Sequence, residues 1–182
     1  MRSFISIEIP GDIRDHIANY MAEINGALTG VKWVKPENIH LTIKFLGNIS
    51  EKNVPSLRDC IYGAAKEFNP FMLTMSNLGY FPNFSHPRVL WIGVDGGLDS
   101  LLDVFQYMEN CLEEAGYDRE ERTFSPHLTI GRARRNSTIE VSGGVREFEP
   151  VSFEIEKLAL MKSTLTPQGP VYESIIESTL GK

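Results

Sequence analysis

The apolar residues of this chain follow two periods, and both periods appear in the same order in the two halves of the sequence. Residues 2–10 (RSFISIEIP) and 88–97 (RVLWIGVDGG) are apolar stretches that predict β-strands. Each stretch is followed by apolar positions three or four residues apart, which predict an amphipathic helix. These positions are Ile13, Ile17, Met21, Ile24 and Leu28 in the first half, and Leu101, Phe105, Met108, Leu112 and Ala115 in the second.

A four-residue motif comes after each predicted helix, in a stretch that alternates like a half-buried strand. It reads HLTI at residues 40–43 and again at residues 127–130. Because side chains at i and i+2 of a strand share a face, each copy directs a histidine and a threonine to one side and two aliphatic residues to the other. A single copy would indicate an ordinary strand, but the two copies hold two of the four histidines in the chain. The repeat therefore indicates a duplicated catalytic strand.

The remaining patterns complete an α+β protein. Apolar residues predict a third helix over 54–68, and strand-like stretches follow the motifs at 71–81 (FMLTMSNLGYF) and 151–161 (VSFEIEKLALM). Residues 133–150 are mostly polar and contain glycine and arginine, so they predict an irregular segment. We predict two similar lobes within one domain, residues 1–182, each built from a strand, a helix, a motif strand and a further strand.

Composition is typical of a compact globular protein. At 182 residues with 42% hydrophobic content the chain is long enough to bury a core as one domain, and we expect a monomer. No apolar run approaches the roughly 20 residues of a membrane-spanning helix, and the start MRSFISIEIP lacks the apolar core of a signal peptide. We therefore expect a cytoplasmic protein without membrane contact. Cys60 and Cys111 fall in helical patterns, where buried free thiols are expected.

Two histidines on facing strands suit chemistry at phosphorus. In an in-line displacement the attacking and leaving oxygens lie on opposite sides of the phosphorus atom, so a base is needed on one side and an acid on the other. Histidine has a reference pKa of about 6.5 and serves in either role near neutral pH. The hydroxyls of Thr42 and Thr129 would donate hydrogen bonds to the non-bridging oxygens. This arrangement requires no metal ion and no other cofactor.

The sequence resembles the two-histidine phosphoesterase superfamily, and in particular the RNA 2′,3′-cyclic phosphodiesterases once called 2′-5′ RNA ligases. The resemblance rests on RSFISIEIP, WVKPENIHLTIKFLG, FPNFSHPRVLWIGV, FSPHLTIGRAR and LALMKSTLTPQGPVYE, which span almost the whole chain. It implies a bilobal α+β fold with a pseudo-two-fold repeat, in which two antiparallel sheets face a central cleft and the helices lie outside. It also implies that the protein opens a ribose 2′,3′-cyclic phosphate at an RNA end to leave a 2′-phosphate, with His40 as proton donor and His127 as proton acceptor.

Two cationic residues near the motifs are candidates for binding the phosphate. Arg132 stands five residues after the second motif histidine, where the family has an anion-binding arginine, but strict strand alternation would turn it away from the cleft. It reaches the cleft only if the strand twists or bulges at Gly131, which glycine permits. Lys44 continues the alternation of His40 and Thr42, so it is expected to face the cleft or to provide a charge at its rim.

Charge limits the size of the substrate. A net charge of −6 and a pI near 5.3 exclude the broad basic surface that gripping a long nucleic acid requires. Arg132, Arg134 and Arg135 form a short basic cluster beside the second motif. The expected partners are therefore RNA 3′ ends or small cyclic nucleotides, and whether nucleoside triphosphates also bind the cleft stays open.

The remaining histidines and aromatic residues have simpler interpretations. His16 falls on the polar side of the first helix, and His86 stands in a loop, so both are expected at the surface. Rings in the loop that contains Tyr80, Phe81 and Phe84 could stack on a base. The core is expected to contain Phe45, Leu46, Trp91 and Phe105.

Two other functional classes compete with a metal-independent phosphodiesterase. One is a non-catalytic module that binds RNA ends or nucleotides, although the presence of both histidines and both threonines argues against it. The other is a metallohydrolase with His40 and His127 as ligands, for which the sequence has no HExxH motif, no paired cysteines and no carboxylate inside either motif. A 2′-5′ RNA ligase side activity is a further alternative that the residues do not rank.

Overall fold

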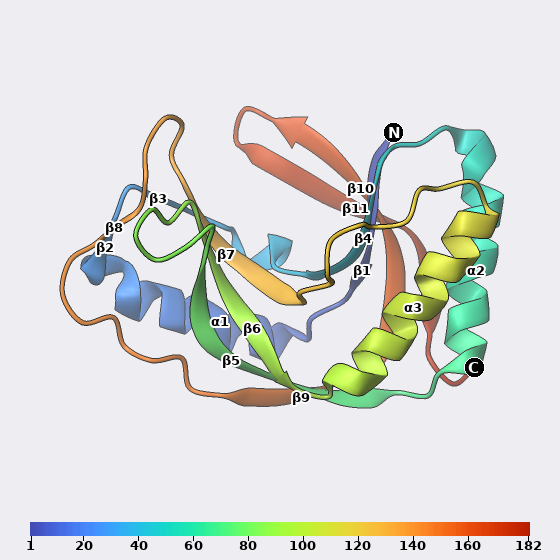
Figure 1. Ribbon diagram of the computed structural model, residues 1–182, viewed down its shortest axis with the longest axis horizontal. Helices are drawn as coiled ribbons and strands as arrows, with labels where there is room; N and C mark the ends of the chain where they lie inside the picture. The colour runs from blue at the N-terminus through green and yellow to red at the C-terminus, as the bar shows by residue number, and fades with distance from the viewer.

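The chain forms three helices and a curled antiparallel sheet (Figure 1). The computed structural model describes residues 1–182. The helices are α1 (Gly11–Ile24), α2 (Val54–Glu67) and α3 (Leu98–Glu114), and short 3₁₀ turns cover Asn25–Ala27, Pro36–Asn38 and Glu51–Asn53. The strands are β1 (Arg2–Ile7), β2 (Leu28–Thr29), β3 (Val31–Trp33), β4 (Leu41–Asn48), β5 (Phe71–Phe81), β6 (Val89–Gly96), β7 (His127–Ala133), β8 (Glu140–Val141), β9 (Val151–Ile155), β10 (Lys157–Thr166) and β11 (Gly169–Thr179).

Nine of the strands pair in one sheet, whose main path runs β11-β10-β1-β4-β7-β6-β5-β9, with β3 paired to β7. All of these pairs are antiparallel. The two middle strands, β4 and β7, carry the motifs and pair at a single position, where Leu41 faces Leu128. The sheet therefore consists of a four-stranded half that contains β4 and a five-stranded half that contains β7 and β3. The two halves are joined at one point, and the motif histidines lie next to that junction.

The strands predicted to follow the motifs do not all lie in the half of the sheet that holds their own motif. β5 comes after the first motif but lies in the half of the second, where it pairs with β6 and β9. The stretch predicted as one strand at 151–161 forms two: β9 stays in the half of the second motif, whereas β10 pairs with β1 and β11 in the half of the first. The predicted α+β class and the repeated order of strand, helix and motif strand are confirmed. β5 and β10 are therefore exchanged between the halves relative to our expectation, because apolar alternation predicts a strand without indicating its partner.

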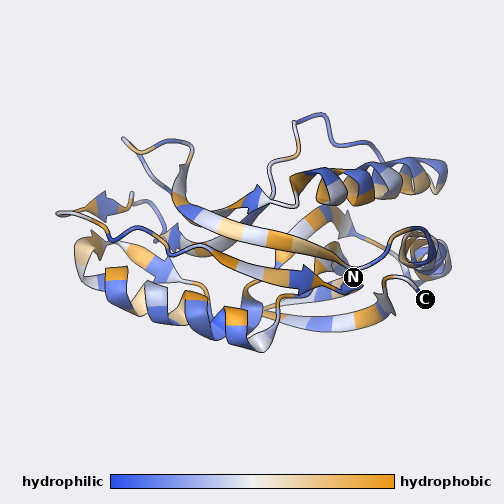
Figure 2. Cartoon of the chain, turned by 90° about the horizontal axis from the view of Figure 1, so that it is seen from below, coloured by the Kyte–Doolittle hydropathy of each residue, from blue (hydrophilic) through white to orange (hydrophobic).

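The helices lie at opposite ends of the sheet. α2 and α3 lie side by side at one end, where α2 packs against β10 and β11 (Figure 1). α1 lies at the other end, where the hydroxyl of Tyr20 donates a hydrogen bond of 2.8 Å to the backbone oxygen of Arg146. Apolar and polar residues alternate along the same helices and strands (Figure 2), as expected of elements with one buried face. None of the helices is long and apolar enough to cross a membrane.

One hydrophobic cluster of 37 buried residues connects the helices with both halves of the sheet. It includes the aliphatic residues of both motifs, Leu41, Ile43, Leu128 and Ile130, none of which is more than 4% exposed. The predicted alternation within the motifs is thus confirmed. The core fixes one face of each motif strand, so the histidines and threonines are left on the other face.

Cys60 and Cys111 form a disulfide bond, so the prediction of free thiols is wrong. Cys60 lies on α2 and Cys111 lies on α3. The packing of the two helices brings their Cα atoms to 5.7 Å, a separation that a disulfide spans. The cysteines are 51 residues apart in the sequence, and neither helical pattern indicates which helix is its neighbour.

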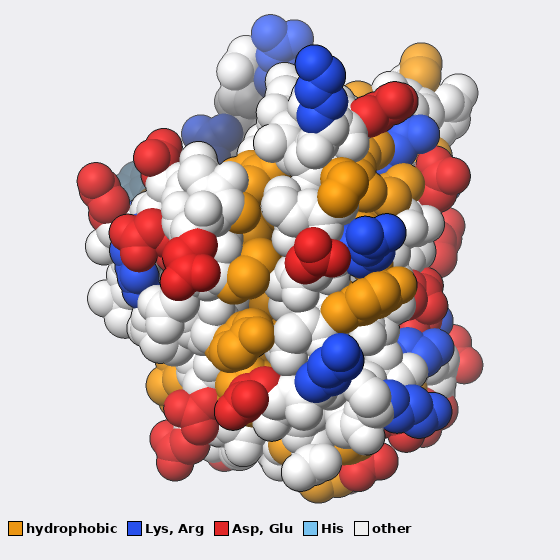
Figure 3. Space-filling model, turned by 90° about the vertical axis from the view of Figure 1, so that its right-hand side faces the viewer, with side chains coloured by type: hydrophobic (Ala, Val, Ile, Leu, Met, Phe, Trp, Pro, Cys, Tyr) orange, Lys and Arg blue, Asp and Glu red, His pale blue; other side chains and the backbone are white.

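The face seen from the right of Figure 1 carries a mixture of side chains (Figure 3). Basic side chains on this face are separated by acidic, apolar and uncharged ones. A long nucleic acid requires a continuous basic track, and this face does not provide one.

Candidate active site

The two motif histidines lie on neighbouring strands at the junction of the two halves. His40 directly precedes β4, and His127 is the first residue of β7. The leucines of the two motifs pair in an antiparallel register. One step along the strands therefore sets His40 across from Thr129, and Thr42 across from His127. The structure thus brings together the four polar motif residues that the sequence indicated.

The backbone two residues before each histidine holds both rings in the same way. The Nδ1 atom of His40 lies 2.7 Å from the backbone oxygen of Asn38, and the Nδ1 atom of His127 lies 2.7 Å from that of Ser125. A carbonyl oxygen only accepts hydrogen bonds, so Nδ1 carries a proton and donates in both rings. In the neutral ring this leaves Nε2 unprotonated and able to exchange a proton with a bound molecule.

Aromatic rings pack against each histidine. The ring of His40 stacks on Phe4 at a centroid distance of 4.6 Å and meets the edge of Tyr172 at 5.0 Å. The ring of His127 meets Phe81 at 5.1 Å and Trp91 at 6.1 Å. These rings restrict the orientation of each imidazole and remove part of its hydration.

Burial lowers the pKa of both histidines from the ordinary value of 6.5. For His40, the hydrogen bond to Asn38 acts in the opposite direction, while the charges of Arg132 and His127 lower the pKa further. For His127, the bond to Ser125 raises the pKa and the charge of Arg132 lowers it. Both rings therefore favour the neutral form in the free protein, and an anion between them would act against this preference.

The strand bulges where the position of Arg132 requires it. The register of β7 against β6 shifts between the pairs that Thr129 and Gly131 form, so Ile130 is an extra residue on β7. The shift reverses the alternation, and Arg132 consequently faces the same side as Thr129. The positive charge of Arg132 lowers the pKa of both histidines, as described above.

The first motif bulges at the matching position, which removes Lys44 from the cleft. The register of β4 against β1 shifts between the pairs that Thr42 and Lys44 form, with Ile43 as the extra residue. Lys44 therefore faces away from Thr42, is 8% exposed, and forms an ion pair of 2.7 Å with Glu109 on α3. Our expectation that Lys44 faces the cleft or its rim is not met, because it assumed an unbroken alternation.

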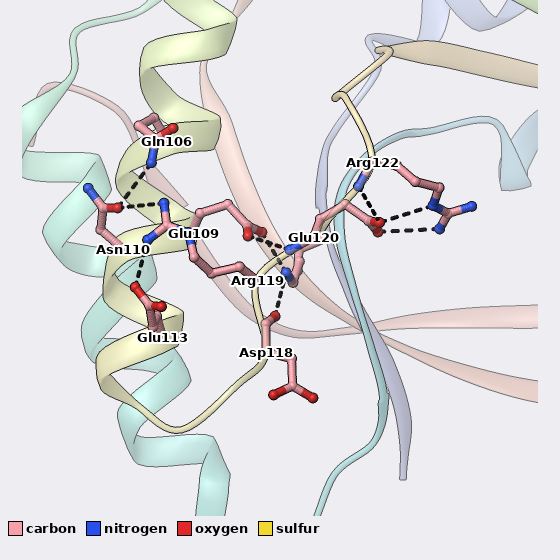
Figure 4. A network of polar contacts seen from close by, with 9 residues as sticks. Gln106, Glu109, Asn110, Glu113, Asp118, Arg119, Glu120 and Arg122 are labelled. Atoms are coloured by element: carbon pink, nitrogen blue, oxygen red, sulfur yellow. Dashed lines mark hydrogen bonds and ion pairs between the residues drawn. The ribbon is translucent and has the colours of Figure 1, made fainter.

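The ion pair of Lys44 belongs to a polar network beneath α3. Lys44 Nζ donates a hydrogen bond of 2.8 Å to the backbone oxygen of Asp118. Glu109 accepts one of 2.8 Å from the backbone N–H of Glu120 (Figure 4). The network connects β4 with the segment after α3 that leads to His127.

Phe45 takes the place in the first motif that Arg132 takes in the second. Each stands five residues after a motif histidine, and the bulge turns each onto the histidine face. Phe45 pairs with Phe4, whose ring stacks on His40, and it is 66% exposed. The expectation that Phe45 lies in the core is wrong for the same reason as that for Lys44. The feature of the sequence that could have indicated this position of Phe45 was its alignment with Arg132 in the repeat.

Some of the remaining histidines and aromatic residues lie where the sequence analysis expected them, and others lie beside the catalytic histidines. His86 is exposed, whereas His16 is half-buried, with its ring against Phe148. Leu46 and Phe105 pack against the core as expected. Trp91 does not, because it is half-buried and its ring lies against Phe81 and His127. Sequence reasoning did not single out Phe4 or Tyr172, because neither belongs to a motif.

No group of three or more histidine, cysteine, aspartate or glutamate side chains gathers at a distance that would hold a metal ion. His40 and His127 thus have no third protein ligand beside them.

Comparison with known proteins identifies the family of the chain. The sequence model of the family described as LigT-like phosphoesterase matches it twice, over residues 7–91 and 92–172. The RNA 2′,3′-cyclic phosphodiesterase of Methanocaldococcus jannaschii is 34% identical to it, over 97% of this chain and 99% of the relative. The protein of the same name from Archaeoglobus fulgidus is 35% identical, over 96% of this chain and 98% of the relative.

Solved structures share the fold over the full length of the chain. TT0787 of Thermus thermophilus superposes with a TM-score of 0.81 at 26% identity, and covers 100% of this chain with 98% of its own. Escherichia coli LigT in complex with 3′-AMP superposes with a TM-score of 0.76 at 24% identity, with the same coverage. The two family matches correspond to the two halves of the repeat. The chain therefore belongs to the family of LigT-like phosphoesterases.

Proposed function

We propose that this protein is an RNA 2′,3′-cyclic phosphodiesterase, which hydrolyses cyclic phosphate ends of RNA to 2′-phosphomonoesters. The observation that carries the proposal is the matched pair of histidines, each with Nδ1 bound to a backbone oxygen and Nε2 left for proton transfer. The names of the relatives from Methanocaldococcus jannaschii and Archaeoglobus fulgidus support the same activity. RNA 3′ ends and small cyclic nucleotides are the proposed substrates.

The proposed reaction is an in-line displacement at phosphorus. Nε2 of His127 removes a proton from water, whose oxygen forms a bond to phosphorus on one side. The P–O3′ bond breaks on the opposite side, its electron pair stays on O3′, and Nε2 of the protonated His40 gives O3′ its proton. The phosphate keeps its bond to O2′, which yields a 2′-phosphomonoester. The resemblance to the family supplies the assignment of acid and base, because the two sites are nearly alike in geometry.

The threonines and Arg132 are proposed to stabilise the charge on the non-bridging oxygens. Thr42 and Thr129 lie diagonally across the junction, so their hydroxyls provide neutral donors from both halves of the sheet. The guanidinium of Arg132 provides a charged donor, and hydrogen bonds from charged donors are shorter and stronger than neutral ones. No step of this mechanism requires a group from outside the chain other than water.

The bound phosphate favours the protonation state that the proposed mechanism requires of the two histidines. In the free protein, burial lowers the pKa of His40, which opposes the protonated state that an acid needs. A cyclic phosphodiester between the rings carries a negative charge, and a nearby negative charge raises the pKa of an imidazole. Substrate binding therefore loads one proton onto the pair.

A single incubation tests the proposed function. An oligoribonucleotide that ends in a 2′,3′-cyclic phosphate is incubated with the protein, and the phosphomonoester formed is identified by chromatography. We expect a 2′-phosphate, which His40→Ala and His127→Ala should not form at an appreciable rate. His16→Ala serves as the matched control, because His16 is a half-buried histidine outside the motifs. A 3′-phosphate product would contradict the assignment of the leaving oxygen, and the absence of any product would contradict the proposed activity.

A further inference from the structure

Trp91 is a half-buried side chain on the cleft face of the sheet, and the proposed mechanism gives it no role. It lies on β6, directly across from Thr129 on β7. Residues that pair across an antiparallel ladder share a face, so the indole lies on the same side of the sheet as the polar residues of the second motif. β5, β6 and β7 are neighbouring strands (Figure 1). The indole therefore covers part of the sheet beside His127.

Two glycines leave space on the sheet for the six-membered ring of this indole. Gly79 on β5 pairs with Trp91, and Gly93, two residues further along β6, pairs with His127. A Cβ atom added to Gly79 would overlap Cζ2 and Cη2 of the indole, and one added to Gly93 would lie 3.0 Å from Cζ3. Glycine in a strand interior weakens the strand and often marks a close approach of another group. Gly79 and Gly93 thus form a seat for the indole, here called the glycine seat.

The seated indole supports the imidazole of His127 together with a second ring. Phe81 stacks on Trp91 at a centroid distance of 5.0 Å with an angle of 30° between the planes. The imidazole meets Phe81 edge to face at 5.1 Å and lies tilted at 59° to the indole at 6.1 Å. The hydrogen bond from Nδ1 to the backbone oxygen of Ser125 fixes one edge of the imidazole. The two aromatic rings restrict its tilt, so Nε2 is held in one direction.

The N–H group of the indole is buried without a hydrogen-bond partner. Most buried tryptophans find an acceptor for this group, and a buried donor without one destabilises the folded state. Phenylalanine at position 91 would avoid this cost, but its single ring is shorter than an indole and would leave the glycine seat unfilled. Hydrogen bonding within the fold therefore gives no reason for a tryptophan at this position, whereas support of His127 does.

The first copy of the repeat has a serine where the second has the tryptophan. Ser6 on β1 takes the place of Trp91, because each pairs with the threonine of its motif. A serine provides no ring to support an imidazole, and His40 packs against rings from β1 and β11 instead. Support by an indole is therefore confined to His127, the histidine that accepts the proton of water in the proposed reaction.

We propose that Trp91 is a positioning residue: on the glycine seat, its indole holds His127 in the direction from which Nε2 accepts a proton from the attacking water. The effect on catalysis rests on the proposed function, whereas the support of the imidazole does not. A displacement of a reacting group by about 1 Å can cost about 10²-fold in rate. The indole acts through the histidine and not on the substrate, so its displacement should lower kcat and leave KM nearly unchanged.

The test displaces the indole in one variant and shortens it in another. Gly79→Ala places a methyl group where the six-membered ring lies, so the ring must shift, whereas Trp91→Phe removes the part of the side chain that fills the seat. We expect each variant to lower kcat for 2′,3′-cyclic AMP by about 10- to 100-fold. In the double variant the methyl group enters the space that the indole has left. Its kcat should therefore equal that of Trp91→Phe alone, and the two effects should not multiply.

Trp33→Phe is the matched control, because Trp33 is the other tryptophan of the chain. It is also half-buried, but it pairs with Gly131 on β7 and packs against the core on the face away from the cleft. Its Nε1 donates a hydrogen bond of 2.7 Å to the side chain of Asn25. Trp33→Phe loses this hydrogen bond, whereas Trp91→Phe loses none, yet only Trp91→Phe should lower kcat.

The pH dependence distinguishes positioning of His127 from a loss of folded protein. Burial is the largest cause of the lowered pKa of His127, and the indole is one of the rings that cover it. Trp91→Phe should raise this pKa toward the ordinary value, and the acidic limb of kcat/KM should move to higher pH, since a base acts in its unprotonated form. The charged groups that act between the two histidines and on them are Arg132 and the histidines themselves, and no variant changes any of these. A smaller folded fraction would lower the whole profile without moving its limb.

Four results would overturn the proposal while hydrolysis by the wild type stands. Normal kcat in both Gly79→Ala and Trp91→Phe would show that His127 needs no support from the indole. A rise in KM at unchanged kcat would mean that the indole binds the substrate. A lower kcat with an unmoved acidic limb would make the tryptophan a part of the fold only. Losses that multiply in the double variant would reject the glycine seat.

Nuclear magnetic resonance titration of the histidine rings separates failure of this proposal from failure of the proposed function. If the wild type hydrolyses no cyclic phosphate, the proposed function fails, and the titration of the free protein still tests the support of His127. A pKa of His127 that is higher in Trp91→Phe than in the wild type, and unchanged in Trp33→Phe, would support it. An equal pKa in the wild type and Trp91→Phe would reject it.

Discussion

Lys44→Met should destabilise the fold strongly, because it leaves the carboxylate of Glu109 buried without a counter-ion. Lys44 is 8% exposed and Glu109 4% exposed, and the two are joined at 2.7 Å. Removal of one partner of a buried ion pair costs about 3–5 kcal/mol. For a chain of this length that corresponds to a fall in Tm of roughly 6–20 °C. Urea denaturation followed by circular dichroism measures the free energy of unfolding.

The surface provides the matched control. Lys162 and Glu173 form an ion pair of 3.1 Å between neighbouring strands, with side chains that are 38% and 64% exposed. Lys162→Met should cost no more than about 1 kcal/mol, since water and salt screen an exposed pair. The difference between the two lysine substitutions then isolates the effect of burial.

A second substitution identifies the unpaired charge as the cause. Glu109→Gln keeps an oxygen that accepts the hydrogen bond from Glu120, and removes the charge. The double variant Lys44→Met/Glu109→Gln should therefore be more stable than Lys44→Met, with a coupling of about 0.5–3 kcal/mol between the two sites. The reasoning is refuted if Lys44→Met costs no more than Lys162→Met, or if it keeps full stability and loses hydrolysis, as a lysine at the cleft would.

Four further predictions concern the chemistry. His40→Ala and His127→Ala should each lower kcat by at least about 10²-fold, and the double variant by less than the product, because the two groups act on one transition state; a folded single variant with normal turnover would remove that histidine from the mechanism. Arg132→Ala should weaken hydrolysis of small cyclic nucleotides more than Thr129→Val does, while Arg134→Ala should lower the rate mainly with longer RNA. Equal effects of the two arginine substitutions in steady-state kinetics would contradict the position of Arg132. Exhaustive chelation should leave activity intact, and activity restored by one added metal ion would support a metallohydrolase. Both histidine pKa values are lowered in the free protein, so the bell-shaped pH profile of kcat/KM should lie below the usual titration range of histidine. The negative charge of bound substrate should move the alkaline limb of the kcat profile to higher pH. A profile that is flat from about pH 5 to 9 would exclude histidine acid-base catalysis.

The sequence predicted the motif strands well because two physical constraints agree there. Alternation requires the aliphatic residues of each motif to share a face, and the core confirms that they do. The repeat then doubles the signal, since one accidental HLTI would carry little weight. Position within the fold was harder to predict, because the partner of a strand or helix depends on contacts that the local pattern does not contain. The exchange of β5 and β10 between the halves, and the disulfide between Cys60 and Cys111, are both consequences of such long-range pairing.

The bulges explain why alternation succeeded for four residues and failed afterwards. An extra residue in a strand reverses the faces of everything that follows it, and a β-branched isoleucine at this point gives no sign of a bulge. At Gly131 the presence of glycine and the required position of Arg132 suggested an interruption, whereas the first motif has Lys44 at the corresponding position and offered no such sign. Comparison of the two repeats would have revealed it, since the structural need for a bulge in one copy predicts a bulge in the other.

The same comparison shows how a duplicated strand can acquire two different roles. In both copies the bulge brings the residue five positions after the histidine onto the cleft side. The backbone therefore places Phe45 and Arg132 on the same face of their strands as the motif histidines. The side chains differ in the way that an asymmetric substrate demands. In the proposed mechanism Arg132 contacts the phosphate, whereas the matching position of the first copy carries the exposed ring of Phe45. The hydrogen bonds of the two histidines are equivalent, so the different side chains at positions 45 and 132 are where the two copies of the repeat depart from symmetry.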